Sequence, residues 1–335
     1  MKFAVYISFI TILFLSFSSC REDFEILADF KEIPIIYGIL NEGDSIHYIR
    51  ISRAYVNDEK NALVIAKDPD SIYYPDVLSV TLLEKESGIS HTLERVNGDT
   101  LGFPKQSGTF ATVPNILYRF QGRIDHSYTY KLTVSNAQTG IVNTAETALV
   151  GESKTIVPHE NYVVNWFGDI KDVANFRWRS AANANIYEMW LQFNYYEIDK
   201  YSGDSTFHSK RMNIFKNMYV PVTSVDFALS NEFYTERFFS FIKANIPEDK
   251  NKWRYPYDMS FDILAGGEVL GNYINSQQAK VSIIEWTITT EYTNIEEGLG
   301  IFSSRSYNTY PAIIGANLRD SLANGVLTRH LNFKN

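Results

Sequence analysis

The sequence has 335 residues, of which 45% are hydrophobic and 15% aromatic, and its formal net charge is −8 at pH 7. This acidic balance argues against a nucleic-acid partner, because phosphate is met by clustered Lys and Arg side chains. The single cysteine excludes an intrachain disulfide, so stability has to come from core burial. The length exceeds what one hydrophobic core usually serves and predicts two domains.

The N-terminus has the pattern of a signal peptide. Lys2 gives a positive start, the apolar run Phe3–Phe17 follows, and small residues precede Cys20. The run is shorter than the roughly 20 residues that a membrane-spanning helix needs. We therefore predict a lipoprotein signal peptide over residues 1–19 and an N-terminal tether over residues 20–29. The alternative is an ordinary signal peptide that leaves a cysteine in the mature chain.

The segment Phe17-Ser18-Ser19-Cys20 resembles a bacterial lipobox, with Phe at a position where Leu is more usual. The resemblance implies that the Cys20 thiol is acylated, and two or three acyl chains hold a protein on a membrane far better than one does. The next residues, Arg21-Glu22-Asp23, resemble the surface-export signal of Bacteroidota lipoproteins. Together they imply a lipid anchor in the outer membrane, with the protein facing the cell exterior.

Residues 30–150 are predicted to form a β-sandwich. Apolar and polar residues alternate along Ser45–Tyr55 and Val77–Lys85, and turn residues such as those of Asn41–Asp44 separate the strands. Short strands at turn spacing with no long helix are typical of a sandwich. The alternation of Tyr128, Tyr130, Leu132 and Val134 resembles the late strands of an immunoglobulin or fibronectin type III-like module.

Residues 155–335 are predicted to form a second β-rich domain, so the whole chain is expected to be mainly β, with a linker at residues 151–154 between two sandwich-like domains in tandem. In the strand expected around Tyr187–Tyr196, Trp190 and Tyr196 fall on the face opposite the core. They either pack under another element or form a platform for a ligand. One helix is predicted near residues 231–245, because apolar residues recur at helical spacing.

Aromatic residues also cluster around a proline in the segment 250–258. Because proline disfavours a central strand, we predict a loop there, and loops often carry function. Flat rings beside an Arg donor suit a sugar ring or a peptide side chain, although a loop packed back on its domain explains them equally well. The candidate ligand-binding residues are Trp253, Arg254, Tyr255, Tyr257, Trp190 and Tyr196.

No motif in the sequence predicts catalysis, a cofactor or a metal. The six histidines are isolated, none has the spacing H-E-x-x-H, and no G-x-S-x-G elbow is present. Glu285 and Glu291 are compatible with glycoside hydrolysis, but solvated strand faces explain most such pairs. Three aspartates lack the spacing of a calcium loop: Asp68, Asp70 and Asp76. We expect a protein that is not an enzyme.

The segments Pro34–Tyr55 and Tyr292–Phe302 together resemble Bacteroidota outer-membrane lipoproteins that share a domain of unknown function. Gly298 and Gly300 in the second segment indicate close backbone approach and not a phosphate cradle. The resemblance implies a partner, a TonB-dependent outer-membrane receptor, and with it the capture of a nutrient such as a glycan or a peptide. It carries over no catalytic residues. The alternatives are a structural or adhesive lipoprotein that binds another protein and, third, a hydrolase.

Overall fold

The computed structural model describes residues 33–54, 61–168, 171–221, 226–279 and 292–335. The predicted signal peptide, the tether, Cys20 and nearly all of the strand expected over 281–292 lie outside these residues. The fold is mainly β, as predicted. Among the described helices, none has the length and apolar composition that crossing a bilayer demands.

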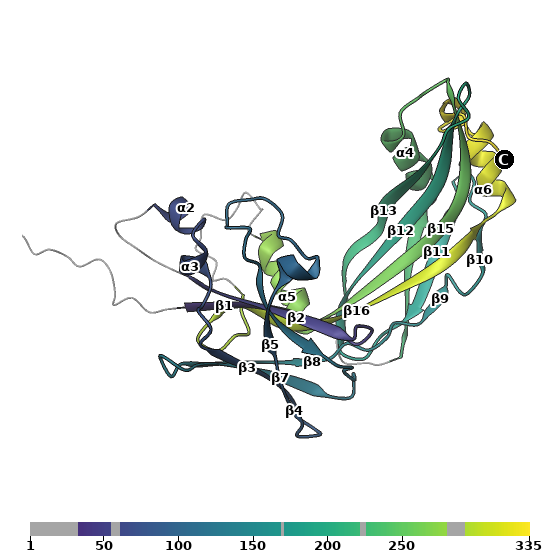
Figure 1. Cartoon of the computed structure of the whole chain (residues 1–335). Coiled ribbons are helices and arrows are strands. Elements are labelled where there is room, and N and C mark those ends of the chain that lie inside the picture. The colour runs from purple at the N-terminus through teal and green to yellow at the C-terminus, as the bar shows by residue number, and fades with distance from the viewer. Residues whose placement is uncertain (1–32, 55–60, 169–170, 222–225, 280–291) are drawn as a thin grey trace, which may run out of the picture. The chain divides into compact units, whose positions relative to one another are not determined.

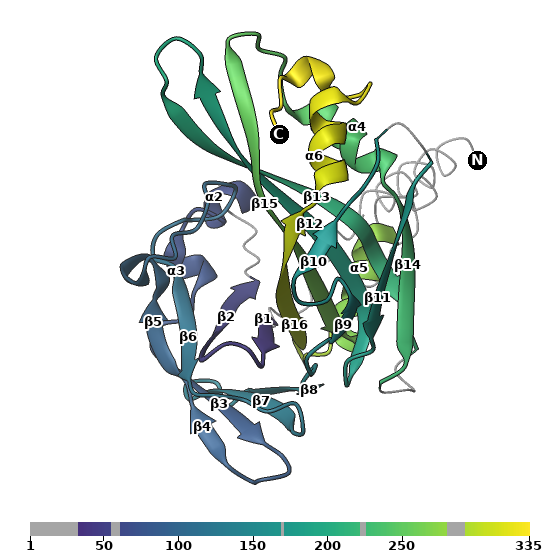
Figure 2. The same cartoon turned by 90° about the vertical axis from the view of Figure 1, so that its right-hand side faces the viewer.

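A nine-stranded sheet joins the early and late parts of the chain, and Figure 2 shows β1 and β16 side by side where they meet. These two strands run parallel, with Ile36 opposite Gly300, and the other neighbours along the main path are antiparallel. In sheet order the strands are β13 (Ser205–Tyr219), β12 (Ala184–Asp199), β15 (Lys252–Gly267), β16 (Leu299–Ile314), β1 (Ile33–Asn41), β2 (Ile46–Ala54), β6 (Ile116–Gln121) and β5 (Glu94–Asn97), while β10 (Tyr162–Val164) pairs with β16 off this path.

A four-stranded antiparallel sheet packs against the β1–β2 part of the large sheet and closes the first core. Val80 and Leu132 from the small sheet share this core with Ile36 and Ile51 from the large one. Alternate side chains of both layers are buried, which is the sandwich arrangement that the alternation predicted. The small sheet has the order β4 (Ser90–Thr92), β3 (Leu78–Glu84), β7 (Thr129–Asn136) and β8 (Val142–Ala148).

A three-stranded sheet packs against the long strands β12 and β15 and closes a second core. Phe176 of the small sheet has its ring centroid 5.2 Å from that of Phe261 on β15. Phe193 of β12 and Phe238 belong to the same fully buried cluster. Figure 1 shows β12, β13 and β15 as long strands lying side by side. The small sheet has the order β14 (Ala228–Tyr234), β11 (Val173–Arg179) and β9 (Thr155–Val157).

Residues 33–335 form one compact unit, and the predicted division at residues 151–154 stays a prediction. Up to Leu149 most buried hydrophobic residues belong to the first core, and from Val150 onward most belong to the second. Strand β16 contributes to both, with Phe302 in the first core and Ile314 in the second. The expected linker is packed: Ser153 is buried, and its carbonyl accepts a hydrogen bond of 2.8 Å from Tyr310 Oη. The parallel pairing of β1 with β16 binds distant parts of the chain, which local sequence patterns do not encode.

The helix predicted near 231–245 begins later, at Glu236. Residues up to Tyr234 belong instead to β14, where Phe233 enters the core and Tyr234 faces outward, because pairing with β11 imposes the period of a strand. The predicted end is confirmed, and the helix buries Phe238, Phe239 and Ile242. The described helices are α2 (Ala62–Ile65), α3 (Pro69–Ile72), α4 (Glu236–Asn245), α5 (Glu268–Ala279) and α6 (Ala316–Asn324), with 3₁₀ turns η1 (Gly98–Leu101) and η2 (Arg329–Leu331).

Candidate functional site

The aromatic segment predicted as a loop is the first part of strand β15, and this prediction is corrected. The segment pairs with β12 from Lys252 onward, whereas β16 joins β15 only from Met259. Backbone groups of Arg254 bond to Asn332 and Lys334, on the side away from β12. Pro256 shares that side, because backbone groups alternate along a strand. Its missing N–H therefore removes no bond with β12 or β16.

Strand alternation separates the four candidates of this segment into two groups. Trp253, Tyr255 and Tyr257 have exposed fractions of 39%, 36% and 56%, whereas Arg254 is 1% exposed. The Arg254 guanidinium lies 2.9 Å from the Glu197 carboxylate and donates to the Leu331 carbonyl at 2.6 Å. The prediction that Arg254 contacts a ligand is therefore wrong, since a buried and paired guanidinium has no donor to offer outside.

The outward rings of three neighbouring strands form one group, which we call the aromatic face. The centroid of Tyr196 lies 5.2 Å from that of Tyr257 and 5.4 Å from that of Phe207 on β13, in edge-to-face packing. Tyr255 stands opposite Tyr196 in the β12–β15 register, and Trp253 stands opposite Ile198. The members of the aromatic face are Trp253, Tyr255, Tyr257, Tyr196 and Phe207.

Phe207 is the member that sequence reasoning missed. It is 49% exposed and lies opposite Tyr196 in the register of β12 with β13. The available signal was the length of the strand pair, since a hairpin around residues 200–204 places Phe207 beside Tyr196. The predicted outward direction of Tyr196 is confirmed by its partly exposed ring, which packs against the exposed rings of Phe207 and Tyr257, whereas Tyr195 before it is buried.

Trp190 also faces outward but lies apart from the aromatic face. It is six residues from Tyr196 along β12, which is about 20 Å in an extended strand. The Arg211 guanidinium carbon lies 4.8 Å and the Lys216 ammonium 5.1 Å from the centre of its ring. Its indole N–H donates to Glu188 at 3.1 Å. Side chains of its own sheet thus contact the Trp190 ring, and the structure does not bring Trp190 together with the aromatic face.

A polar strip separates Trp190 from the aromatic face. Asn194 Nδ2 donates to Asp258 Oδ1 at 2.6 Å across β12 and β15. Farther along, Asp262 is 3% exposed and accepts bonds of 2.9 Å from both Arg211 and Thr309. These bonds satisfy the buried carboxylate and link β15 to β13 and β16.

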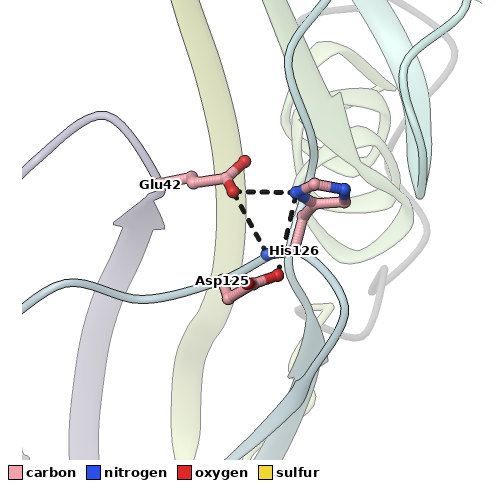
Figure 3. Close-up of side chains that lie close together, drawn as sticks. All are labelled: Glu42, Asp125 and His126. Carbon is pink, nitrogen blue, oxygen red and sulfur yellow. Dashed lines mark hydrogen bonds and ion pairs between the residues drawn. The ribbon is translucent and has the colours of Figure 1, made fainter.

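One group among the described residues has the composition of a metal site: Glu42, Asp125 and His126 (Figure 3). His126 Nδ1 lies 2.7 Å from Glu42 Oε1, and this hydrogen bond raises the pKa of the imidazole. The Asp125 carboxylate accepts both the N–H and the hydroxyl of Ser127, at 2.8 and 2.7 Å. The atoms that could bind a metal are thus already engaged in the Glu42–His126 pair and in the turn at Asp125. The group holds the β1–β2 turn near the turn before β7. Glu285 and Glu291 lie outside the described residues.

Comparisons with known proteins add no family. No protein-family model matches the sequence, and no curated protein matches it. Among solved structures, a cytokine receptor complex matches over 84% of this chain and 96% of its own, with 9% identity and a TM-score of 0.22. Elastase-activated alpha-2-macroglobulin of Escherichia coli matches over 85% of this chain and 20% of its own, with 8% identity and a TM-score of 0.18. The C-terminal globular domain of an oligosaccharyltransferase from Pyrococcus abyssi matches over 85% and 50%, with 9% identity and a TM-score of 0.18. Likenesses this slight carry no argument about function.

Proposed function

We propose that this chain is a lipid-anchored binding protein of the outer-membrane surface that captures a nutrient, a glycan or a peptide, for a TonB-dependent transporter. The aromatic face is the observation that carries the binding role. The lipobox-like segment ending at Cys20, the acidic residues after it and the lipoprotein resemblance support the location and the transporter partner. The membrane contact in this proposal is the acylated Cys20.

The aromatic face has the physical properties of a stacking platform. Its rings are partly exposed, and three of them, Tyr196, Tyr257 and Phe207, are held edge to face against one another. Rings that are already fixed lose little conformational entropy when a ligand stacks on them. Strands position side chains more exactly than loops do, so the correction from loop to strand favours a preorganised site. The apolar face of a sugar ring or a peptide side chain suits such a surface.

A second candidate function is adhesion to another protein. The same rings favour it, because exposed Tyr, Trp and Phe are enriched in protein interfaces and the rings lie on a sheet surface instead of in a deep pocket. In this case the protein co-purifies with a receptor from detergent extracts, and the purified protein binds no oligosaccharide or peptide.

The binding role is tested with full-length protein in detergent micelles, screened against glycan and peptide arrays and then by calorimetry with each hit. We expect the double variant Trp253→Ala/Tyr255→Ala to lose at least tenfold in affinity and to reduce uptake by cells. Tyr307→Ala is the matched control, because Tyr307 is 42% exposed on another strand of the same sheet. Unchanged binding and uptake in the double variant contradict the site. The anchor is tested with radiolabelled palmitate, which the wild-type protein should incorporate and Cys20→Ala should not. Proteinase shaving of intact cells tests which side of the membrane the protein faces.

A further inference from the structure

A recess apart from the aromatic face lies on the outward side of β1, β2, β6 and β16. Its volume is about 520 Å³, within the range of small-molecule sites. None of its residues belongs to the aromatic face. We call it the basic cleft, and the lining residues that matter are Tyr37, Tyr48, Arg50, Phe103, Asn115 and Arg305.

Two guanidinium groups line the basic cleft, and neither has a carboxylate partner among the residues that the structure describes. Arg50 donates a hydrogen bond from Nη2 to Asn115 Oδ1 at 3.1 Å, and its buried Nε–H meets no acceptor within the described ranges. Arg305 is exposed, and its side chain has no hydrogen bond or ion pair to any part of the chain that the structure describes. Lys105 adds a third positive charge near Arg50, while Asp99, which accepts the Asn115 N–H at 2.9 Å, is the nearby acid. The local charge is positive in a chain of net charge −8.

Aromatic rings form the walls around these charges. The ring centroids of Tyr48 and Phe103 lie 5.3 Å apart, and Phe103 is 51% exposed. Tyr37 stands opposite Arg50 in the β1–β2 register, and its ring packs edge-on against Tyr273 of α5 at 6.3 Å. The rings and the guanidinium groups therefore line one open recess.

Asn115 holds the two kinds of group in place. It is 2% exposed, its carbonyl oxygen accepts from Arg50, and its amide donates to the Phe103 carbonyl at 2.8 Å. One buried side chain thus fixes the guanidinium on β2 relative to the ring that follows η1. A guanidinium fork matches a planar anionic group, and adjacent rings match the apolar face of a sugar. Peptides with acidic side chains offer the charge but not the rigid ring.

We propose that the basic cleft binds an acidic sugar, a pyranose ring that bears a carboxylate or a sulfate. Arg50 and Arg305 meet the anion, and Phe103, Tyr48 and Tyr37 contact the ring. This site is independent of the aromatic face, and it adds a preference for acidic glycans whether or not the face binds a ligand.

The test uses full-length protein in detergent micelles and calorimetry with four probes: digalacturonate, its neutral methyl ester, a sulfated disaccharide and tetraglutamate. We expect binding of digalacturonate, of the sulfated sugar or of both, and the pair of acidic probes shows which anion the cleft accepts. The methyl ester and tetraglutamate should bind at least tenfold more weakly. Affinity should fall as salt is raised, because the attraction is partly screened. Equal binding of the methyl ester, equal binding of tetraglutamate, or no binding of either acidic sugar overturns the proposal.

Variants assign the binding to the cleft. Arg305→Gln and Phe103→Ala should each weaken the acidic probe at least tenfold, with unchanged circular dichroism and melting temperature. Arg177→Gln is the matched control, since Arg177 is an exposed strand Arg on β11 and does not line the cleft. Trp253→Ala/Tyr255→Ala should leave the affinity unchanged, so failure of one site is distinguished from failure of the other. Full affinity in Arg305→Gln and Phe103→Ala contradicts the assignment.

Discussion

Arg254 and Glu197 form an ion pair at 2.9 Å directly beneath the exposed rings of β15 and β12. The Arg254 side chain is 1% exposed, and that of Glu197 is 17% exposed. The same guanidinium donates to the carbonyls of Leu331 and Pro247, so it links the two long strands to the C-terminal segment and to the loop after α4. The pair is therefore a structural support of the aromatic face.

Replacing Arg254 with Met should destabilise the protein by about 3 kcal/mol, because removing one partner leaves a largely buried carboxylate and two carbonyls without donors. Urea unfolding of the full chain measures the change. Lys252→Met is the control on the same strand, since the Lys252–Asp199 pair is more exposed, at 28% and 26%, and should matter much less. Equal losses in the two variants would mean that burial does not set the strength of the Arg254 pair.

The alternation of strands was predictable from sequence because it is a local property. Met189 and Leu191 are buried and Trp190 faces outward, as the period of two requires. The burial of Arg254 was not predictable, because its acceptors include Leu331, whose carbonyl lies 77 residues farther along the chain. The loop predicted around Pro256 was wrong because whether a strand tolerates proline depends on which edge is paired.

In the architecture, too, local patterns were predictable from sequence and contacts between distant segments were not. The β1–β2 hairpin follows from turn residues and alternation close together in sequence. The parallel pairing of β1 with β16 joins residues such as Ile36 and Gly300, and no local pattern specifies a partner so far away. The close backbone approach predicted for Gly298 and Gly300 is nonetheless confirmed, because glycine marks such places whichever segment approaches.

Gly300→Ala should destabilise the protein by about 3 kcal/mol or more. Gly300 has φ +95°, and an added Cβ would overlap the carbonyl oxygen of Ile36 on β1, so strain and overpacking add together. Gly88→Ala is the control: its φ is +73°, but an added Cβ meets nothing within 4 Å, and the cost should be about 1–2 kcal/mol. Thermal and urea unfolding compare the variants, and a milder effect at Gly300 than at Gly88 would contradict the close approach of β1 and β16.

His126 and His47 should titrate on opposite sides of the ordinary imidazole value of about 6.5. The hydrogen bond to Glu42 raises the pKa of His126, whereas burial lowers the pKa of His47 despite its bond to the Gly122 carbonyl. The stabilisation from His126 is therefore full below pH 6.5 and is lost as the pH rises through the raised pKa. The stabilisation linked to His47 is full above pH 6.5 and is lost as the pH falls through the lowered pKa of His47.

Imidazole resonances in NMR titrations measure both pKa values directly. Glu42→Gln should lower the pKa of His126 and leave that of His47 unchanged, because the second ring lies against Phe120 and not against Glu42. A pKa of His126 that does not respond to Glu42→Gln would show that the ion pair in Figure 3 does not govern its protonation.

Tyr196 and Tyr257 should be coupled in stability even before any ligand is considered. Their rings pack at 5.2 Å with an interplanar angle of 80°, an edge-to-face geometry that contributes about 0.5–1.5 kcal/mol beyond area burial. A double-mutant cycle with Tyr196→Ala, Tyr257→Ala and the double variant isolates this energy by urea unfolding. Tyr257 with Tyr307 provides the uncoupled control cycle, because Tyr307 lies on β16 away from these rings. A coupling energy near zero for the first cycle would mean that the rings move independently, and the aromatic face would then lack the preorganisation that makes it a binding surface.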